Sequence, residues 1–322
     1  MRLTNNMIST NYMKNLTKNM KQLTDMNTKV SSQRRFLKMS EDPAIALSAF
    51  QVRKDIARNE MYKKTLDESQ GMLDEAEIAI SNINDVATNA RVQIMQGITG
   101  TSGEAEQKVT AQELRKYQEM ILGAANARFS DKYVFGGKEF ENTPFTLDGA
   151  GNLQYYGQNV DSGSFGAESR YVDIGIGMDV DAGGNVTPQS ALDTAYSGIT
   201  LLGSGLDGDG LSNNLYQLLG QIADKLEAGD LSNMDMYLKK LDVKADDIRM
   251  QYVSVGEKSN YISFFADKLD RDKLAASTKQ NKLEELSLEE GALAFSQQEL
   301  VYNACLQMGM KLLQPSLLDY LS

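Results

Sequence analysis

Three glycines near the middle of the chain have the spacing of a nucleotide-binding loop. Gly203, Gly205 and Gly208 satisfy the pattern G-x-G-x-x-G, and the apolar run Ile199 to Leu202 before them could form a short strand. A dinucleotide loop opens directly into a helix whose N-terminus faces the pyrophosphate. Here the flexible, acidic sequence DGDG follows at residues 207–210. We therefore interpret this stretch as a linker and not as a nucleotide site.

A second stretch has part of the spacing of a calcium-binding loop. Asp179, Asp181 and Gly184 occupy the first, third and sixth positions of that pattern. The fifth position is Gly183 and the twelfth is Ser190, so two of the expected oxygen ligands are missing. Since the remaining residues are typical of a β-turn, we predict a turn and no metal site.

The residue types needed for common catalytic sites are scarce. The chain has no His and a single Cys, Cys305, which excludes the usual triads, Cys metal clusters and an internal disulfide. The carboxylate pairs Glu284-Glu285 and Glu289-Glu290 lie on a predicted helix, whereas catalytic pairs need a pocket that separates their pKa values. We predict no catalytic residue, no cofactor and no enzyme activity. An acidic hydrolase in the Gly-rich region is the alternative from another class, but it lacks a visible nucleophile or metal constellation.

Charge is distributed unevenly along the 322 residues. Residues 1–40 contain eight Lys or Arg and one acid, Asp25, a net charge of +7, so the chain total of −11 leaves −18 for the rest. A basic, acid-poor N-terminus fits an organelle transit peptide, a nucleic-acid-binding arm or the solvated face of a helix, and it lacks the apolar core of a secretory signal. No run of 18 apolar residues is present, so we expect no membrane span.

Two long heptad patterns define the predicted helices. In each, small or apolar residues recur at alternating steps of four and three, with one Ser as the polar exception. The first pattern is Tyr62, Leu66, Ser69, Leu73, Ala76, Ile80, Ile83, Ala87, Ala90, Ile94. The second is Met234, Leu238, Leu241, Ala245, Ile248, Tyr252, Val255, Ser259, Ile262, Ala266, Leu269. The sequence Asp42-Pro43 is a helix start signal, so a helix from about Asp42 to about Gln96 is expected. Such helices predict a mainly α, rod-like bundle or coiled coil.

Further elements complete this bundle and interrupt it. A third helix is expected from Glu104 to Ser130, with Leu114, Tyr117, Ile121 and Ala124 on one face, and a shorter one after Ser212, with Leu215, Leu219, Ile222 and Leu226. Residues 144–210 differ, since they hold 14 of the 26 Gly and nine acids against one base, Arg170. Strands are expected at Asn152 to Tyr156 and Tyr171 to Ile176, which makes this region a small β-rich insertion.

Both chain ends carry narrow apolar stripes that we predict to be assembly surfaces. Neither stripe is wide enough to form a stable helix alone in water, so the two ends should pair with each other, with neighbouring subunits, or both. The final dozen residues are also rich in Leu, and Pro315 prevents one ordinary helix from using all of them. The predicted interface residues are Met13, Leu16, Met20, Leu23, Leu293, Leu300, Leu313, Leu317, Leu318 and Leu321.

The expected domain organisation follows from these elements. Residues 1–41 with 280–322 should form an inner coiled-coil assembly domain. Residues 42–143 with 211–279 should form the helical rod, with a β-hairpin near 131–145. Residues 144–210 should form the outer insertion.

Four motifs resemble the bacterial flagellin-like family, and within it the hook-associated proteins of the hook–filament junction. They are the opening MRLTNNMISTNYMKNL, the segment MSEDPAIAL, the stretch RFSDKYVFGGKEFENTPF at 128–145, and the ending LLQPSLLDYLS. The resemblance covers nearly the whole chain. Glu41 stands where the family commonly has Asp, and SSQRRF differs from the usual Ser-Thr-Gly-Lys-Arg. A divergent flagellin is the alternative within the family, but flagellins typically lack the Tyr-Val-Phe-Gly-Gly hairpin and this ending.

The resemblance implies a structural protein of bacterial motility with no cofactor. It implies self-assembly into a ring, contact with the neighbouring junction protein and with flagellin, and a dedicated export chaperone at the C-terminus. It further implies an extracellular place in the flagellum, secretion through the flagellar type III apparatus without a cleaved signal peptide, and no nucleic-acid or membrane partner.

Overall fold

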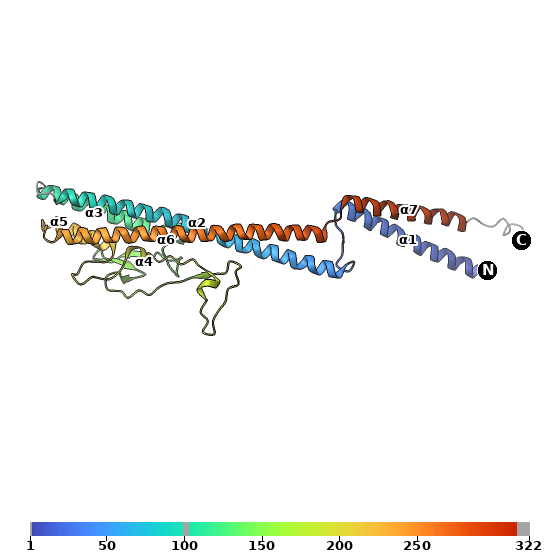
Figure 1. Cartoon of the computed structure of the whole chain (residues 1–322), viewed down its shortest axis with the longest axis horizontal. Helices are drawn as coiled ribbons and strands as arrows, with labels where there is room; N and C mark the ends of the chain where they lie inside the picture. Colours follow the sequence, from blue (N-terminus) through green and yellow to red (C-terminus); the bar gives the residue numbers. More distant parts are fainter. Residues whose placement is uncertain (1, 99–102, 314–322) are drawn as a thin grey trace. The chain divides into compact units, whose positions relative to one another are not determined.

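The computed structural model describes residues 2–98 and 103–313, which form seven α-helices and three small antiparallel sheets. The helices are α1 (Arg2–Ser32), α2 (Pro43–Gly97), α3 (Glu104–Ala125), α4 (Gly198–Leu202), α5 (Leu215–Glu227), α6 (Met234–Glu284) and α7 (Leu288–Leu313) (Figure 1). They belong to two compact units: unit 1 is Met1–Glu60 with Arg271–Ser322, and unit 2 is Met61–Asp270. Helices α2 and α6 therefore contribute one part to each unit.

The start of α2 is the predicted one. Asp42 Oδ1 accepts a hydrogen bond from the backbone N–H of Ile45 at 3.1 Å, and its carbonyl accepts one from Ala46 at 2.9 Å. Pro43 is the first helical residue, where its missing N–H costs nothing because the first turn has no intrahelical acceptor for it. The helix from about Asp42 to about Gln96 is thus confirmed, with Pro43 and Gly97 as its ends.

In unit 2, the two heptad patterns form the seam of a helical bundle. Every member of the α2 series from Leu66 to Ile94 is buried, and Tyr62 is half-buried. In α6 the seam is buried or half-buried except at Tyr252, which is 40% exposed and donates its hydroxyl to Glu77 Oε1 at 2.7 Å. The predicted mainly α bundle with a β-rich insertion is confirmed.

Helices α3 and α5 pack against each other in the same bundle. The predicted α5 residues Leu215, Leu219, Ile222 and Leu226 are all buried. Asn214 caps this helix, since its Oδ1 accepts hydrogen bonds from the backbone of Tyr216 and Gln217.

The predicted C-terminus of the third helix is wrong by five residues, because α3 ends at Ala125 and not at Ser130. Strands β1 (Arg128–Phe129) and β2 (Lys132–Tyr133) form a hairpin here, with Ser130 and Asp131 at φ of 44° and 65°. A helix cannot contain such left-handed residues. Asn126 ends the helix by exchanging two hydrogen bonds with the backbone of Phe145.

The insertion contains two further sheets. Strands β3 (Phe145–Leu147), β4 (Leu153–Tyr155) and β5 (Gln158–Asn159) form an antiparallel sheet in chain order, and β6 (Tyr171–Val172) pairs with β7 (Leu192–Asp193) after the short 3₁₀ helix η1 (Pro188–Ser190). Phe145, Leu153 and Ile174 of the insertion are fully buried, as is Phe135 shortly before it. The apolar run Ile199 to Leu202, which could have formed a short strand, belongs instead to α4.

The insertion is packed against the bundle of unit 2. The Tyr62 hydroxyl on α2 donates to Asp173 Oδ2 at 3.1 Å, and a Cβ at Gly175, whose φ is +86°, would lie 2.7 Å from the Tyr62 ring. On α6, the backbone carbonyl of Gln251 accepts a hydrogen bond from the Tyr196 hydroxyl at 3.1 Å. The insertion is thus held along two helices of the bundle.

Candidate assembly surface

Helices α1 and α7 pair along one face of each helix, so the two ends of the chain meet in unit 1 (Figure 1). Asn19 Nδ2 of α1 donates to the Cys305 sulfur of α7 at 2.8 Å, and Gln298 Nε2 reaches the Asn19 carbonyl at 3.4 Å. Gly309 is buried, and a Cβ there would lie 2.0 Å from the Tyr12 hydroxyl oxygen. The absence of a side chain at Gly309 therefore permits the close approach of the two helices.

Ion pairs and backbone bonds join the base of this pair to the neighbouring helices of unit 1. Arg53 of α2 forms a two-pronged bond to the Glu284 carboxylate, with nitrogen–oxygen distances of 2.7 and 2.5 Å. This bond holds the pKa of Glu284 below its ordinary value. Beside it, the Arg35 N–H donates to the Glu284 carbonyl at 2.8 Å, and Lys29 pairs with Glu41 at 2.6 Å. These bonds thus connect α1, the segment that follows it and the first part of α2 with the end of α6.

The structure divides the predicted interface residues into two groups. Leu16 and Leu23 are half-buried and share the helical face of Tyr12 and Asn19, which is the face against α7. In contrast, the second group is exposed: Met13 by 54%, Met20 by 57%, Leu293 by 63% and Leu300 by 71%. Leu313 closes α7 without a described side chain, and Leu317, Leu318 and Leu321 lie outside the described residues.

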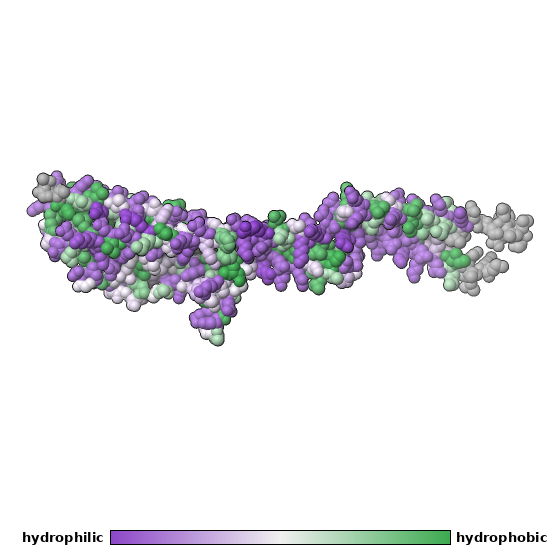
Figure 2. Space-filling view, viewed as in Figure 1, coloured by the Kyte–Doolittle hydropathy of each residue, from purple (hydrophilic) through white to green (hydrophobic). Residues whose placement is uncertain are grey.

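The exposed group belongs to a larger set of apolar side chains on the α1–α7 pair. Green apolar side chains interrupt the hydrophilic surface along these helices in Figure 2. The members that are more than a third exposed are Met7, Ile8, Met13, Met20, Leu288, Leu293, Leu300, Val301, Leu306, Met308 and Met310. We call this set the α1–α7 apolar surface. Exposed apolar side chains in this number on one pair of helices are candidates for contact with other proteins.

Unit 1 has little interior of its own. Among its described residues, the buried apolar side chains are Ala46, Ala49 and Val52, all on α2. No Leu, Ile, Met or Phe of α1 or α7 with a described side chain is fully buried. Since burial of large apolar side chains is the main source of stability, the α1–α7 pair has little stability from a core of its own.

The structure also shows the geometry of the two loop motifs. Gly205 donates its N–H to the Val160 carbonyl at 2.9 Å, and the next helix begins at Leu215, well after the glycines. Asp181 Oδ1 accepts the N–H groups of Asn185 and Gly183, both at 2.8 Å, which lowers the pKa of this carboxyl group and makes the stretch a turn. Within residues 2–98 and 103–313, no group of three His, Cys, Asp or Glu side chains is arranged to hold a metal ion.

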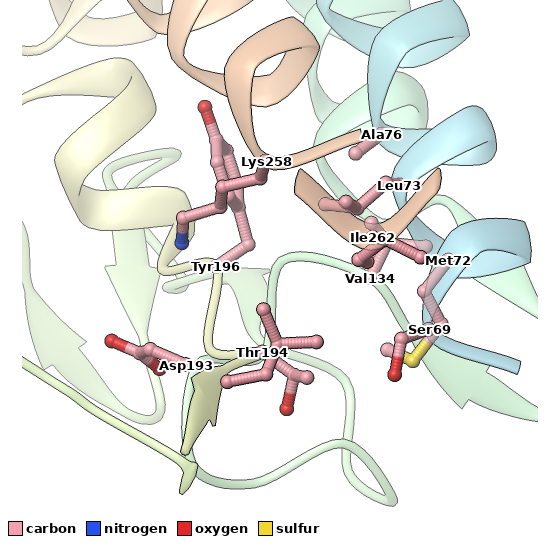
Figure 3. A pocket seen from close by; sticks show the side chains of 11 residues that line it. Ser69, Met72, Leu73, Ala76, Val134, Asp193, Thr194, Tyr196, Lys258 and Ile262 are labelled. Atoms are coloured by element: carbon pink, nitrogen blue, oxygen red, sulfur yellow. The ribbon is translucent and has the colours of Figure 1, made fainter. Parts of the chain in front are cut away.

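A small cavity lies between the bundle and the insertion in unit 2 (Figure 3). Leu73 of α2 and Ile262 of α6 line its apolar side. On its other side the Lys258 Nζ lies 5.6 Å from the centroid of the Tyr196 ring. Its volume of about 10 Å³ has room for one water molecule at most. The cavity is therefore a packing feature and has no room for a substrate.

None of the helices in the described part of the chain combines the length and apolar character of a membrane span.

Comparison with known proteins agrees with this fold. Residues 3–139 match the model of the bacterial flagellin N-terminal helical region. No curated protein sequence matches the chain significantly.

Several solved structures are similar over most of their length. A flagellar hook-associated protein of Vibrio parahaemolyticus is 14% identical, with a TM-score of 0.61 over 76% of this chain and 100% of that one. Hook-associated protein-3 of Legionella pneumophila is 11% identical, with a TM-score of 0.57 over 72% and 98%. FlgL of Bacillus cereus is 21% identical, with a TM-score of 0.52 over 72% and 99%.

Residues 3–139 are therefore similar to the bacterial flagellin N-terminal helical region, a match that covers less than half of the chain. More particularly, about three quarters of the chain has the fold of the flagellar hook-associated proteins, including hook-associated protein-3 and FlgL.

The sequence patterns did not indicate the contacts of Tyr12, Asn19, Cys305 and Gly309. The available signal was the position of Gly309 inside a helix-forming segment, because a helix-interior Gly is unfavourable unless another element needs the space.

Proposed function

We propose that this protein is a structural component of the bacterial flagellum and forms the junction between hook and filament. The observation that carries the proposal is the α1–α7 apolar surface on a unit made from both chain ends, in a chain with the hook-associated fold. An exposed apolar surface on a pair of helices with almost no interior is best explained by burial against neighbouring subunits. The role is mechanical, and the proposal assigns no catalytic activity to the chain.

In this proposal, copies of the chain assemble into a ring through residues 1–41 and 280–322, the assembly domain. Residues 42–143 with 211–279 form the rod, and residues 144–210 form the outer insertion. The ring contacts the neighbouring junction protein on one side and flagellin on the other. Export proceeds through the flagellar type III apparatus, with a chaperone on the Leu-rich C-terminal segment beforehand. The apolar character of that segment, which would favour aggregation if left exposed, supports the last step.

Localisation on intact flagella tests the proposal. Gold-labelled antibody against the insertion should mark one band at the boundary of hook and filament, and sheared filaments should contain the protein only as a trace component. Label along the whole filament, or bulk abundance there, would instead identify a divergent flagellin.

Matched variants test the surface itself. The double variant Leu293→Gln, Leu300→Gln changes two side chains that are 63% and 71% exposed, so it should leave the unassembled fold intact. We expect cells carrying it to make hooks and release flagellin into the medium. The control is Leu147→Gln, Leu206→Gln in the insertion, where the side chains are 44% and 52% exposed, and it should assemble normally. Normal filaments with the first variant would refute the assigned surface.

A further inference from the structure

Methionine is concentrated at the surface of this protein. Of the 16 Met residues, one is buried in the described structure, Met234 at 4% exposure. Twelve are more than a third exposed, namely Met7, Met13, Met20, Met39, Met61, Met95, Met120, Met178, Met236, Met250, Met308 and Met310. A core role therefore does not explain most of them.

Four of these side chains belong to the set that makes up the α1–α7 apolar surface. Met13 and Met20 are seven residues apart on α1, with 54% and 57% exposure. Met308 and Met310 lie near the end of α7, with 58% and 65% exposure. Before assembly their thioether groups are thus open to small solutes, whereas neighbouring subunits packed around the two helices would cover them.

Exposed thioethers react with hydrogen peroxide in a simple two-electron step. A sulfur lone pair attacks one peroxide oxygen and the O–O bond breaks. The sulfur is oxidised to a sulfoxide, and the other peroxide oxygen leaves as water after proton transfer. The flexible apolar side chain becomes a polar one with a strong hydrogen-bond acceptor, which disrupts Met-rich interfaces.

We infer that Met13, Met20, Met308 and Met310 are sulfoxidation sites through which peroxide blocks the addition of a subunit to the growing structure. The inference rests on the proposed function, because it needs the α1–α7 apolar surface to be buried on assembly. A sulfoxide placed there loses its hydration and finds apolar neighbours, so the oxidised subunit binds more weakly. In subunits already assembled these Met side chains are protected from peroxide, because the contact between subunits covers their thioether groups.

The first measurement maps the oxidation. The purified full-length chain is treated with hydrogen peroxide, and each Met is followed by peptide mass spectrometry. Met13, Met20, Met308 and Met310 should oxidise at about the rate of the exposed Met250, and Met234 at least ten times more slowly, as its burial requires. Protection of the four sites to the level of Met234 would overturn the inference.

The second measurement follows assembly onto hooks isolated from cells that lack this protein. Peroxide treatment should reduce incorporation of the wild-type chain at least tenfold. A variant with Leu at Met13, Met20, Met308 and Met310 should keep its incorporation after treatment. A matched variant with Leu at Met61, Met120, Met236 and Met250, which are exposed in unit 2, should remain as sensitive as the wild type.

The outcomes separate the two proposals. If the untreated wild type fails to join the hooks, the proposed function is wrong. If it joins them and the oxidised chain joins equally well, or if the unit 2 variant is the protected one, the inference is wrong. Repair of the oxidised wild type with methionine sulfoxide reductases A and B should restore incorporation, and a lack of recovery would also overturn it.

Discussion

Replacement of Ile80 by Ala should destabilise unit 2 substantially. Ile80 has no exposed surface and lies in the α2 seam, between Leu73 and Ala87 one heptad away on either side. The change removes three carbon groups, each worth about 0.8 kcal/mol in transfer from water, and the cavity left behind adds to this. We therefore expect a loss of about 3 to 4 kcal/mol in the free energy of unfolding.

Two residues away, Ile78 provides the matched control. It lies on the same helix but is 56% exposed, so Ile78→Ala should cost under about 1 kcal/mol. Thermal unfolding followed by circular dichroism distinguishes the two. For a unit of this size about 1 kcal/mol corresponds to about 2 to 4 °C, which gives a decrease in Tm of about 6 to 16 °C for Ile80→Ala. Equal shifts for the two variants would refute the assignment of the seam. Ile80→Asp should be more severe, since it also buries an unpaired charge.

The remaining predictions concern unit 1. Asn19→Cys should form a disulfide with Cys305 inside one chain, because the native side-chain atoms are 2.8 Å apart; a non-reducing gel should show a shifted monomer, and exclusive formation of dimers would contradict the α1–α7 pairing. The pKa of Glu284 is lowered mainly by its bond to Arg53, so its contribution is present above the unfolded pKa of about 4.3 and is lost as the pH falls below it. Since Arg53 is half exposed, Arg53→Gln should remove about 1 kcal/mol or less at pH 7 and weaken the acid dependence, as measured by urea unfolding across pH 3 to 7. Deletion of Lys311–Ser322 should leave the thermal stability of unit 2 unchanged but prevent incorporation into the flagellum; normal filaments, or a large loss of stability, would show that this segment has another role.

The helices were predictable because the capping residues and the heptad spacing of apolar residues indicate the same helical segments. Asp42-Pro43 encodes a cap and a first turn, and a strict heptad pattern leaves one way to bury its apolar residues. Prediction failed where distant contacts override local preference. The helix ending at Ala125 is stopped by the contact of Asn126 with Phe145, and Ile199 to Leu202 is apolar enough to suit either a strand or a buried helix.

The apolar stripes at both chain ends were visible in the sequence, but the arrangement of their side chains was not. Met13 and Leu16 are both apolar and close on the helix, yet one is open to solvent and the other faces α7. Apolar spacing identifies which residues avoid water, but it does not say which neighbour covers each one. The α1–α7 contact itself depends on Asn19, Cys305 and Gly309, whose types carry no heptad signal.

The continuity of unit 2 has a consequence for the order of folding. Residues 61–270 form one unbroken segment, whereas unit 1 needs both chain ends. Within unit 2, Lys63 and Asp270 form an ion pair at 2.5 Å, so the two points where the chain leaves the unit are adjacent. Closing a flexible loop as long as residues 61–270 would cost about 4 to 5 kcal/mol in chain entropy. When unit 2 is already folded, this cost no longer opposes the formation of unit 1. A folded unit 2 therefore gives the two segments of unit 1 a high effective concentration relative to each other, and unit 1 should form last.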